Sequence, residues 1–205
     1  MDFSDNNQKL SKKFYNGELL QTAKNLLGKI IVRKLRNHLL AGRIVEVEAY
    51  DGSVDEAAHS FKGITERTKV MFQEGGCLYV YFTYGAHYCA NIVTGKQGEG
   101  KAVLIRAVEP LNHFNILAKN RFSKNTLNDK EKFNLTNGPG KFCKAFSIDK
   151  TNNGTDLLSD KIYLLNNRKI NSRNIIETKR IGITKSVDLP WRFYIKENPY
   201  VSKQR

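Results

Sequence analysis

Two glutamates, a tyrosine and a histidine occur close together in residues 43–60, and their side chains could perform acid–base chemistry. Glu46 and Glu48 are two positions apart, so in a β-strand both carboxylates point to one side of the sheet, together with Tyr50. Two like charges on one face can produce a general base or a general acid. His59 follows an acidic, turn-rich segment that brings an imidazole within reach of the same place. The same spacing also fits two solvated glutamates on an edge strand, and the pattern alone does not separate the two interpretations.

The segment begins as a strand with its polar residues on an unexpected face. Strict alternation predicts Ile44, Glu46, Glu48 and Tyr50 on one face, and Val45, Val47 and Ala49 on the other. Apolar runs flank this strand, so we expect it to be central in its sheet. Carboxylates at such a position are costly to bury unless they are paired or take part in a reaction.

Arg106 is a second polar residue in an apolar strand, the run KAVLIRAVEP of residues 101–110. A guanidinium there needs an acidic partner or an anionic ligand, and the carboxylates of residues 43–60 are candidates. A purely structural salt bridge fits this pattern equally well.

A hairpin of aromatic residues is predicted for residues 77–93, with its turn near Gly85. Tyr79 and Tyr81 share one strand face, where aromatic residues usually belong to a core. Tyr84 is at the tip, where a large ring cannot easily be buried in its own domain. We therefore expect Tyr84 to act as an apolar wedge toward a partner.

The remaining sequence predicts strands with a few helices around them. Helices are expected at residues 17–27, 110–121 and after Gly138 within 135–146, strands at 29–35, 39–50, 161–165, 174–184 and 191–195, and loops at 61–69 and 123–132. We therefore expect an α+β fold: a single mixed domain over residues 1–205, with a curved, largely antiparallel β-sheet and peripheral helices.

The composition is strongly basic, with 34 Lys and Arg against 20 Asp and Glu and a formal net charge of +14. This balance favours a polyanionic partner, nucleic acid first and an anionic membrane surface second. No segment has about 20 consecutive apolar residues, and the first ten residues lack targeting features, so we expect a cytoplasmic protein. Three cysteines without C-x-x-C spacing predict buried, reduced thiols rather than disulfides or a zinc cluster.

Taken in order, several blocks of this chain resemble the alkyladenine (3-methyladenine) DNA glycosylase family. The blocks are RIVEVEAYDGSVDEAAHS (43–60), VMF (70–72), LYVYFTYGAHYCANIV (78–93), AVLIRAVEP (102–110), LTNGPGKFCKAF (135–146), RIGI (180–183) and LPWRFYI (189–195). The resemblance implies a monofunctional base-excision-repair enzyme that acts as a monomer on double-stranded DNA, without metal or cofactor, associated with the nucleoid if the source is bacterial. It implies that a damaged purine, such as 3-methyladenine, 7-methylguanine, hypoxanthine or ethenoadenine, is flipped out and hydrolysed from its sugar.

The resemblance also assigns roles to individual residues. Glu48 is expected to be the general base that activates water, with Arg106 and the backbone near Ile181 completing the water site. The base pocket is expected to consist of Tyr50, His59, Tyr81, Asn91 and Ile181, with Tyr84 intercalating into the DNA. Possible phosphate contacts are Arg67, Lys69, Lys141 and Arg180. The chain departs from the family at the wedge hairpin, where Ala86 stands in place of a common Met.

Three other functions fit parts of the sequence. A non-catalytic damaged-DNA binding module would keep the basic surface and the wedge, although retention of both Glu48 and Arg106 argues against it. A bifunctional glycosylase with lyase activity would use Lys141 or Lys144 as an amine nucleophile. The acidic residues between positions 46 and 56 could instead serve a metal-dependent nuclease.

Overall fold

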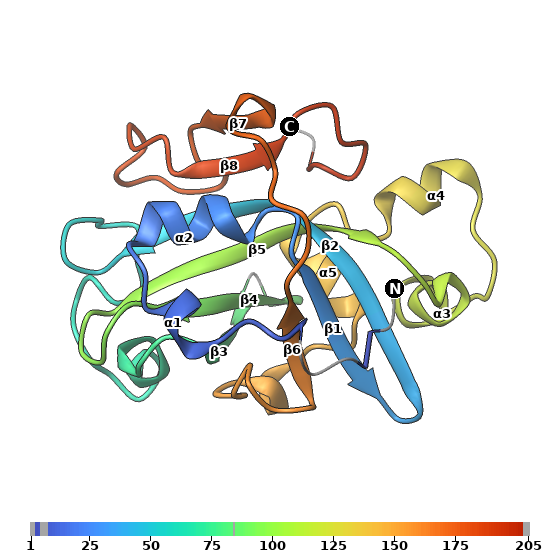
Figure 1. Cartoon of the computed structure of the whole chain (residues 1–205), viewed down its shortest axis with the longest axis horizontal. Helices are drawn as coiled ribbons and strands as arrows, with labels where there is room; N and C mark the ends of the chain where they lie inside the picture. The colour runs from blue at the N-terminus through green and yellow to red at the C-terminus, as the bar shows by residue number, and fades with distance from the viewer. Residues whose placement is uncertain (1–2, 5–7, 84, 203–205) are drawn as a thin grey trace.

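The structure is a computed structural model, and it describes residues 3–4, 8–83 and 85–202 (Figure 1). Within these residues, eight strands form one sheet in the order β3-β4-β5-β2-β1-β6, with β8 pairing to β2 and β7 to β8. The strands are β1 (Ile30–Leu35), β2 (His38–Asp51), β3 (Leu78–Thr83), β4 (His87–Thr94), β5 (Lys101–Pro110), β6 (Ile162–Leu165), β7 (Ile175–Thr178) and β8 (Arg192–Ile195). All of these pairings are antiparallel, so the predicted α+β class with a largely antiparallel sheet is confirmed.

The helices are short and surround the sheet, as Figure 1 shows. They are α1 (Lys12–Tyr15), α2 (Leu19–Leu26), α3 (Phe114–Phe122), α4 (Asp129–Asn134) and α5 (Pro139–Ala145), with 3-10 turns η2 (Lys69–Phe72), η3 (Lys150–Asn152) and η4 (Ser172–Asn174). Helix α2 ends as predicted before Gly28, which has a φ of 86°, a conformation that glycine adopts without strain. The predicted loop at 123–132 is wrong at its end, because Asn128 and Glu131 form a capping box that starts α4.

Strand β2 is central in the sheet, as the sequence predicts. Its first half pairs with β1, its second half pairs with β8, and β5 lies along its other edge. Glu46 and Glu48 are both fully buried, so the interpretation as solvated edge-strand residues is wrong. Apart from them, the long strand buries mainly apolar side chains, and Leu40, Ile44, Val47 and Ala49 belong to the main core.

The predicted alternation of β2 is interrupted by an irregularity. The register shifts on both sides of Glu46, where Ile44 pairs with Val108 but Glu46 pairs with Ala107. A bulge of this kind changes the face to which the preceding residues point. Ile44 therefore packs into the main core, and Val45 packs with Ala107 on the other side. The prediction that Ile44 shares a face with the glutamates is wrong for this reason.

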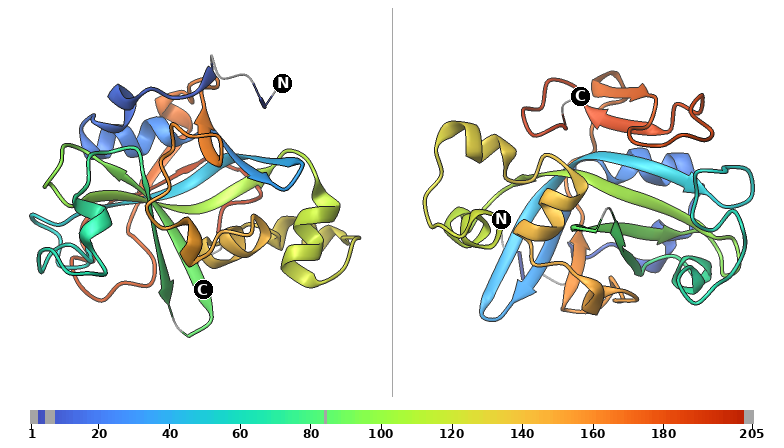
Figure 2. Two further views of the ribbon diagram at one scale, coloured as in Figure 1. Left: turned by 90° about the horizontal axis from the view of Figure 1, so that it is seen from below. Right: turned by 180° about the vertical axis from the view of Figure 1, so that it is seen from behind.

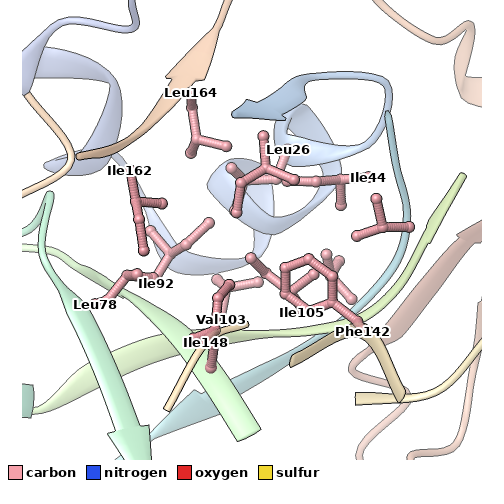
Figure 3. Packing of buried hydrophobic residues seen from close by; sticks show 14 of the residues in the cluster. Leu26, Ile44, Leu78, Ile92, Val103, Ile105, Phe142, Ile148, Ile162 and Leu164 are labelled. Atoms are coloured by element: carbon pink, nitrogen blue, oxygen red, sulfur yellow. The ribbon is translucent and has the colours of Figure 1, made fainter. Parts of the chain in front are cut away.

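The main core lies between the sheet and the helices α2 and α5. Figure 3 shows Leu26 of α2 and Phe142 of α5 among Ile44, Ile92 and Ile105 of the strands. Every one of these side chains is fully buried. At roughly 1.5–3 kcal/mol for each buried aliphatic or aromatic side chain, this cluster holds β2 and β5 rigidly, and these two strands carry the polar residues of interest.

Strands β3 and β4 extend from the body of the molecule as a hairpin, seen in green in the left view of Figure 2. This confirms the hairpin predicted for residues 77–93. Tyr84, the predicted wedge, lies outside the described residues. Gly140 allows α5 to approach the hairpin closely, because a Cβ at this position would lie 2.8 Å from the Cβ of His87.

Two further features concern the chain as a whole. No helix among the described residues is both long and apolar enough to cross a membrane. Cys77, Cys89 and Cys143 are buried and free, as predicted.

Candidate active site

A cavity of about 480 Å³ opens on the face of the sheet that carries Glu48. This volume is in the range of small-molecule sites. Its walls come from β2, the β3–β4 hairpin, β5 and the connection between β7 and β8. Lining residues include Glu48, Tyr50, His59, Met71, Tyr79, Tyr81, Cys89, Asn91, Leu104, Arg106, Ile181 and Lys185. The cavity therefore combines aromatic rings with a carboxylate and a guanidinium.

Glu48 is held by two hydrogen bonds and an ion pair, and it still borders the cavity. Its Oε1 accepts a hydrogen bond from the Ile181 backbone N–H at 2.8 Å and faces Arg106 Nη1 at 3.2 Å. Its Oε2 accepts from the Tyr50 hydroxyl at 2.8 Å. Burial, with a contribution from Glu48, raises the pKa of the Tyr50 phenol, so this hydroxyl stays protonated and donates. The carboxylate is thus fixed in orientation at the wall of the cavity.

Glu46 has similar burial but no access to the cavity. Its Oε1 accepts from Arg106 Nε at 3.0 Å, Arg192 Nε at 2.7 Å and Ser202 Oγ at 2.7 Å. Its Oε2 accepts from the Ser202 backbone N–H at 2.7 Å. Four donors occupy this carboxylate, and it is absent from the cavity wall.

Arg106 connects the two glutamates. Its Nε bonds to Glu46, and its Nη1 lies beside Glu48. Burial alone would lower the pKa of Arg106, but Glu48 and Glu46 outweigh burial and raise it. The sequence prediction that the carboxylates of residues 43–60 are partners of Arg106 is therefore confirmed, with both of them taking part.

Aromatic rings line the side of the cavity toward the hairpin. His59 lies edge-on to Tyr81, with ring centroids 4.4 Å apart, and its Nδ1 is 3.0 Å from the Tyr79 hydroxyl. Tyr79 and Tyr81 stack at 5.5 Å. Burial, and to a lesser degree Arg67, lowers the pKa of His59 to about 4, so its ring is neutral at pH 7. Tyr79 is buried as predicted for a core residue, yet it also borders the cavity.

Comparison with known proteins agrees with this geometry. The family described as "Methylpurine-DNA glycosylase (MPG)" matches residues 13–199. The chain belongs to this family. A protein of Clostridium beijerinckii named "Putative 3-methyladenine DNA glycosylase" is 48% identical over 201 residues, which cover 95% of this chain and 99% of that protein. Proteins of the same name from Alkaliphilus oremlandii (48% over 202 residues, 96% and 100%) and Clostridium botulinum strain Alaska E43 (46% over 201 residues, 95% and 99%) are similar over the same extent.

The resemblance to glycosylases found in the sequence is thereby confirmed at the level of the family. Membership supports an N-glycosylase of the hydrolase class with DNA as its substrate. The structure gathers Glu48, Arg106 and the predicted pocket residues around one cavity, as the glycosylase resemblance requires. Of these, Asn91 is buried in the wall, where its Nδ2 donates to the Tyr79 carbonyl at 3.2 Å.

The predicted phosphate contacts of this glycosylase lie in different environments. Arg67 is exposed beside the cavity, 5.6 Å from the Tyr81 ring. Lys69 is exposed and pairs with Glu66 at 2.7 Å. Lys141, in the first turn of α5, donates to Asn137 Oδ1 at 2.7 Å. All three remain predictions as contacts to DNA.

Arg180 differs from the other three because its side chain is completely buried. It forms two hydrogen bonds with Asp55 and donates to the Ala49 carbonyl at 3.0 Å. Its guanidinium lies 4.6 Å from the Tyr50 ring. A guanidinium buried in this way cannot contact a DNA phosphate. Instead the ion pair anchors the residue that precedes Ile181, and with it the N–H that bonds to Glu48.

The segment around Arg180 also departs from its predicted secondary structure. Strand β7 ends at Thr178 rather than continuing to residue 184. The chain beyond it forms an irregular connection whose residues 181–185 line the cavity. In a paired strand, the backbone N–H groups of these residues would bond to a neighbouring strand. Because the residues lie outside the sheet, the Ile181 N–H can donate to Glu48.

The acidic residues that suggested a nuclease each have a basic neighbour. Besides the two glutamates, Asp55 pairs with Arg180, Glu56 with Lys185 at 3.0 Å and Asp51 with Lys101 at 4.0 Å. Across residues 3–4, 8–83 and 85–202, no group of three His, Cys, Asp or Glu side chains is arranged to hold a metal ion.

Sequence reasoning missed Arg192, Asp55 and Ser202. Arg192 is an arginine in an apolar strand, the same signal that singled out Arg106, and this signal could have found it. Asp55 was seen only as part of an acidic turn. Ser202 carries no signal in the sequence, because its contact with Glu46 joins residues 156 positions apart.

Proposed function

We propose that this protein is a monofunctional DNA glycosylase of base excision repair that acts as a monomer on damaged purines in duplex DNA. It flips the purine into the cavity and hydrolyses the N-glycosidic bond with water activated by Glu48, leaving an abasic site. One observation carries this proposal: two hydrogen bonds and an ion pair with Arg106 hold Glu48 at the wall of an aromatic cavity. The family match supplies the substrate class, DNA.

The aromatic walls suit a flipped base. Extrusion costs a few kcal/mol of pairing and stacking, least at a damaged or mismatched position. The family resemblance implies Tyr50 and His59 on one side of the base and Tyr81 on the other, and all three residues border the cavity. A cationic purine, such as 3-methyladenine or 7-methylguanine, gains further from the electron-rich tyrosine faces. In this proposal Tyr84 fills the vacated space in the DNA stack.

The hydrolysis follows from the position of Glu48. Water attacks C1′ of the deoxyribose, Glu48 accepts the proton, and the bond from C1′ to the purine nitrogen breaks with its electron pair leaving on the base. Positive charge develops on the sugar, and the carboxylate stabilises it. Arg106 and the Ile181 N–H hold the carboxylate in the orientation this step requires.

Neutral lesions need more assistance because their leaving group carries no positive charge. Hypoxanthine and ethenoadenine belong to this class. His59 is neutral at pH 7 because burial lowers its pKa to about 4, so one ring nitrogen keeps a proton that can be donated to a base edge. Asn91, buried in the cavity wall, limits the size of the purine that enters.

The test is base release from a panel of duplexes that each carry one defined lesion. We expect release of methylated purines and of hypoxanthine, full activity in EDTA, and no covalent adduct after borohydride treatment. Release from none of the duplexes, with binding retained, would instead support the non-catalytic damaged-DNA binding module. An EDTA-sensitive strand break would indicate a nuclease, and a trapped adduct would indicate a lyase.

A further inference from the structure

Residues 198–202 pack against buried polar residues beneath the cavity. Ser202 is buried and gives Glu46 two hydrogen bonds, one from its backbone N–H at 2.7 Å and one from its hydroxyl at 2.7 Å. Tyr200, two residues earlier, packs with Val45 and Ala107 on the same side of β2 and β5. The tail thus reaches a carboxylate that has no contact with solvent.

Glu46 in turn determines where Arg106 points. The Arg106 Nε carries a single hydrogen, and it is directed at Glu46 Oε1 at 3.0 Å. With the planar guanidinium fixed at this edge, its Nη1 falls 3.2 Å from Glu48. Any rotation of the Glu46 carboxylate would therefore turn Arg106 away from Glu48.

The bonds to Glu46 leave little freedom for such a rotation. Arg192 Nε shares Oε1 with Arg106 and Ser202 Oγ, while the Ser202 N–H alone bonds to Oε2. Ser202 is the one residue among these donors that bonds to both oxygens. It therefore restrains the torsion of the carboxylate, which the two arginines, both bonded to Oε1, do not.

We propose that Ser202 is a positioning residue for the active site, which orients Arg106 toward Glu48 through the carboxylate of Glu46. Its effect on base release rests on the proposed glycosylase function, whereas its effect on Arg106 does not. Ser202 accordingly takes part in positioning Arg106, although it has no contact with the cavity.

The first experiment compares single-turnover base release by the full-length protein and three variants. Ser202→Ala removes the hydroxyl bond to Glu46 Oε1 and leaves residue 202 bonded to Oε2 alone through its backbone N–H, whereas Ser202→Thr retains both bonds. Asn198→Ala removes two other tail contacts, the bond from Asn198 Nδ2 to Glu109 Oε2 at 3.2 Å and the bond from the Tyr200 N–H to Asn198 Oδ1 at 2.9 Å, neither of which involves Glu46. We expect Ser202→Ala to slow the chemical step about tenfold, equivalent to about 1.4 kcal/mol, with duplex affinity within about twofold of wild type. Ser202→Thr should restore the rate, and Asn198→Ala should leave it unchanged.

The second experiment observes the Arg106 guanidinium by NMR in the DNA-free protein. Its Nε–H resonance in a ¹⁵N NMR spectrum, assigned with Arg106→Lys, should shift and exchange faster with solvent in Ser202→Ala but not in Asn198→Ala. If Ser202→Ala does not fold, Ser202→Cys, with a weaker donor of similar size, takes its place in both experiments.

The outcomes separate this inference from the proposed function. An unchanged Arg106 Nε–H resonance overturns the positioning role, whatever happens to the rate. A shifted resonance with a wild-type rate also overturns it, because the orientation would then have no consequence. If wild type releases no base, the glycosylase proposal fails, and the resonance alone decides whether Ser202 orients Arg106.

Discussion

Glu46 and Glu48 are the same residue type, two positions apart on one strand and equally buried, yet their surroundings differ. Glu46 receives four hydrogen bonds, and none of its surface meets the cavity. Glu48 has three partners and borders the cavity. The comparison teaches that access to the cavity, rather than burial or strand position, separates a structural carboxylate from one that can act on a substrate.

Removal of the Glu46 carboxylate should have the largest effect on stability. Glu46→Ala leaves two buried guanidiniums, Arg106 and Arg192, without this partner. Breaking buried ion pairs in this way costs about 3–5 kcal/mol of unfolding free energy. Urea denaturation followed by circular dichroism measures it. The matched variant Glu48→Ala should lose clearly less, because Arg106 keeps Glu46. Equal losses for the two variants would contradict the distinction between them.

The pair of Asp55 and Arg180 supports the cavity from its other side, and weakening it should have an intermediate effect. Asp55→Asn keeps one acceptor but removes the charge, at a cost of about 1–3 kcal/mol in unfolding free energy. Base release should also slow, because Arg180 holds the backbone next to Ile181. Asp188→Asn, which disrupts the exposed pair with Lys179, serves as the control and should change neither quantity measurably. An Asp55→Asn protein with wild-type stability and base release would contradict the role of this pair in supporting the cavity.

His59 provides the smallest effect, a shift in titration. Its pKa of about 4 is below the reference value of 6.5, so the unfolded chain binds more protons between these pH values. The contribution of His59 to stability is therefore complete above pH 6.5 and is lost as the pH falls toward 4. NMR titration of the imidazole should give a pKa near 4. Arg67→Ala should raise this pKa only slightly, because burial lowers it more than Arg67 does. A pKa near 6.5 in wild type would show that the ring is solvated.

Much of the fold follows from local patterns in the sequence. Strand β5 was predicted with its observed bounds, and β2 and the β3–β4 hairpin were predicted closely, because β-branched and aromatic runs determine them. The bulge at Glu46 was not foreseen, since it depends on the register between β2 and β5. Helix α4 was missed because its six residues expose most of their surface and show no apolar periodicity.

The candidate site was predictable only in part. Strand spacing indicated that Glu46 and Glu48 belong together but could not rank them, and it was the family resemblance that singled out Glu48. Their roles differ because of Ile181, Arg192 and Ser202, which come from the last 25 residues of the chain. Contacts over such separations leave no periodic signal. The burial of Arg180 was missed for the same reason, because its partner Asp55 is 125 positions away.

The most direct test of the central claim is base release by Glu48→Gln beside Glu46→Gln, in single turnover on a duplex with one methylated purine or hypoxanthine. Both changes preserve shape and remove a charge. Glu48→Gln should slow release by about 10²- to 10⁴-fold while it still binds the duplex. Glu46→Gln should slow release by only about tenfold, as expected for Ser202→Ala, because it disturbs the orientation of Arg106 but leaves the Glu48 carboxylate in place. Robust release by Glu48→Gln would contradict the assignment of Glu48 as the base.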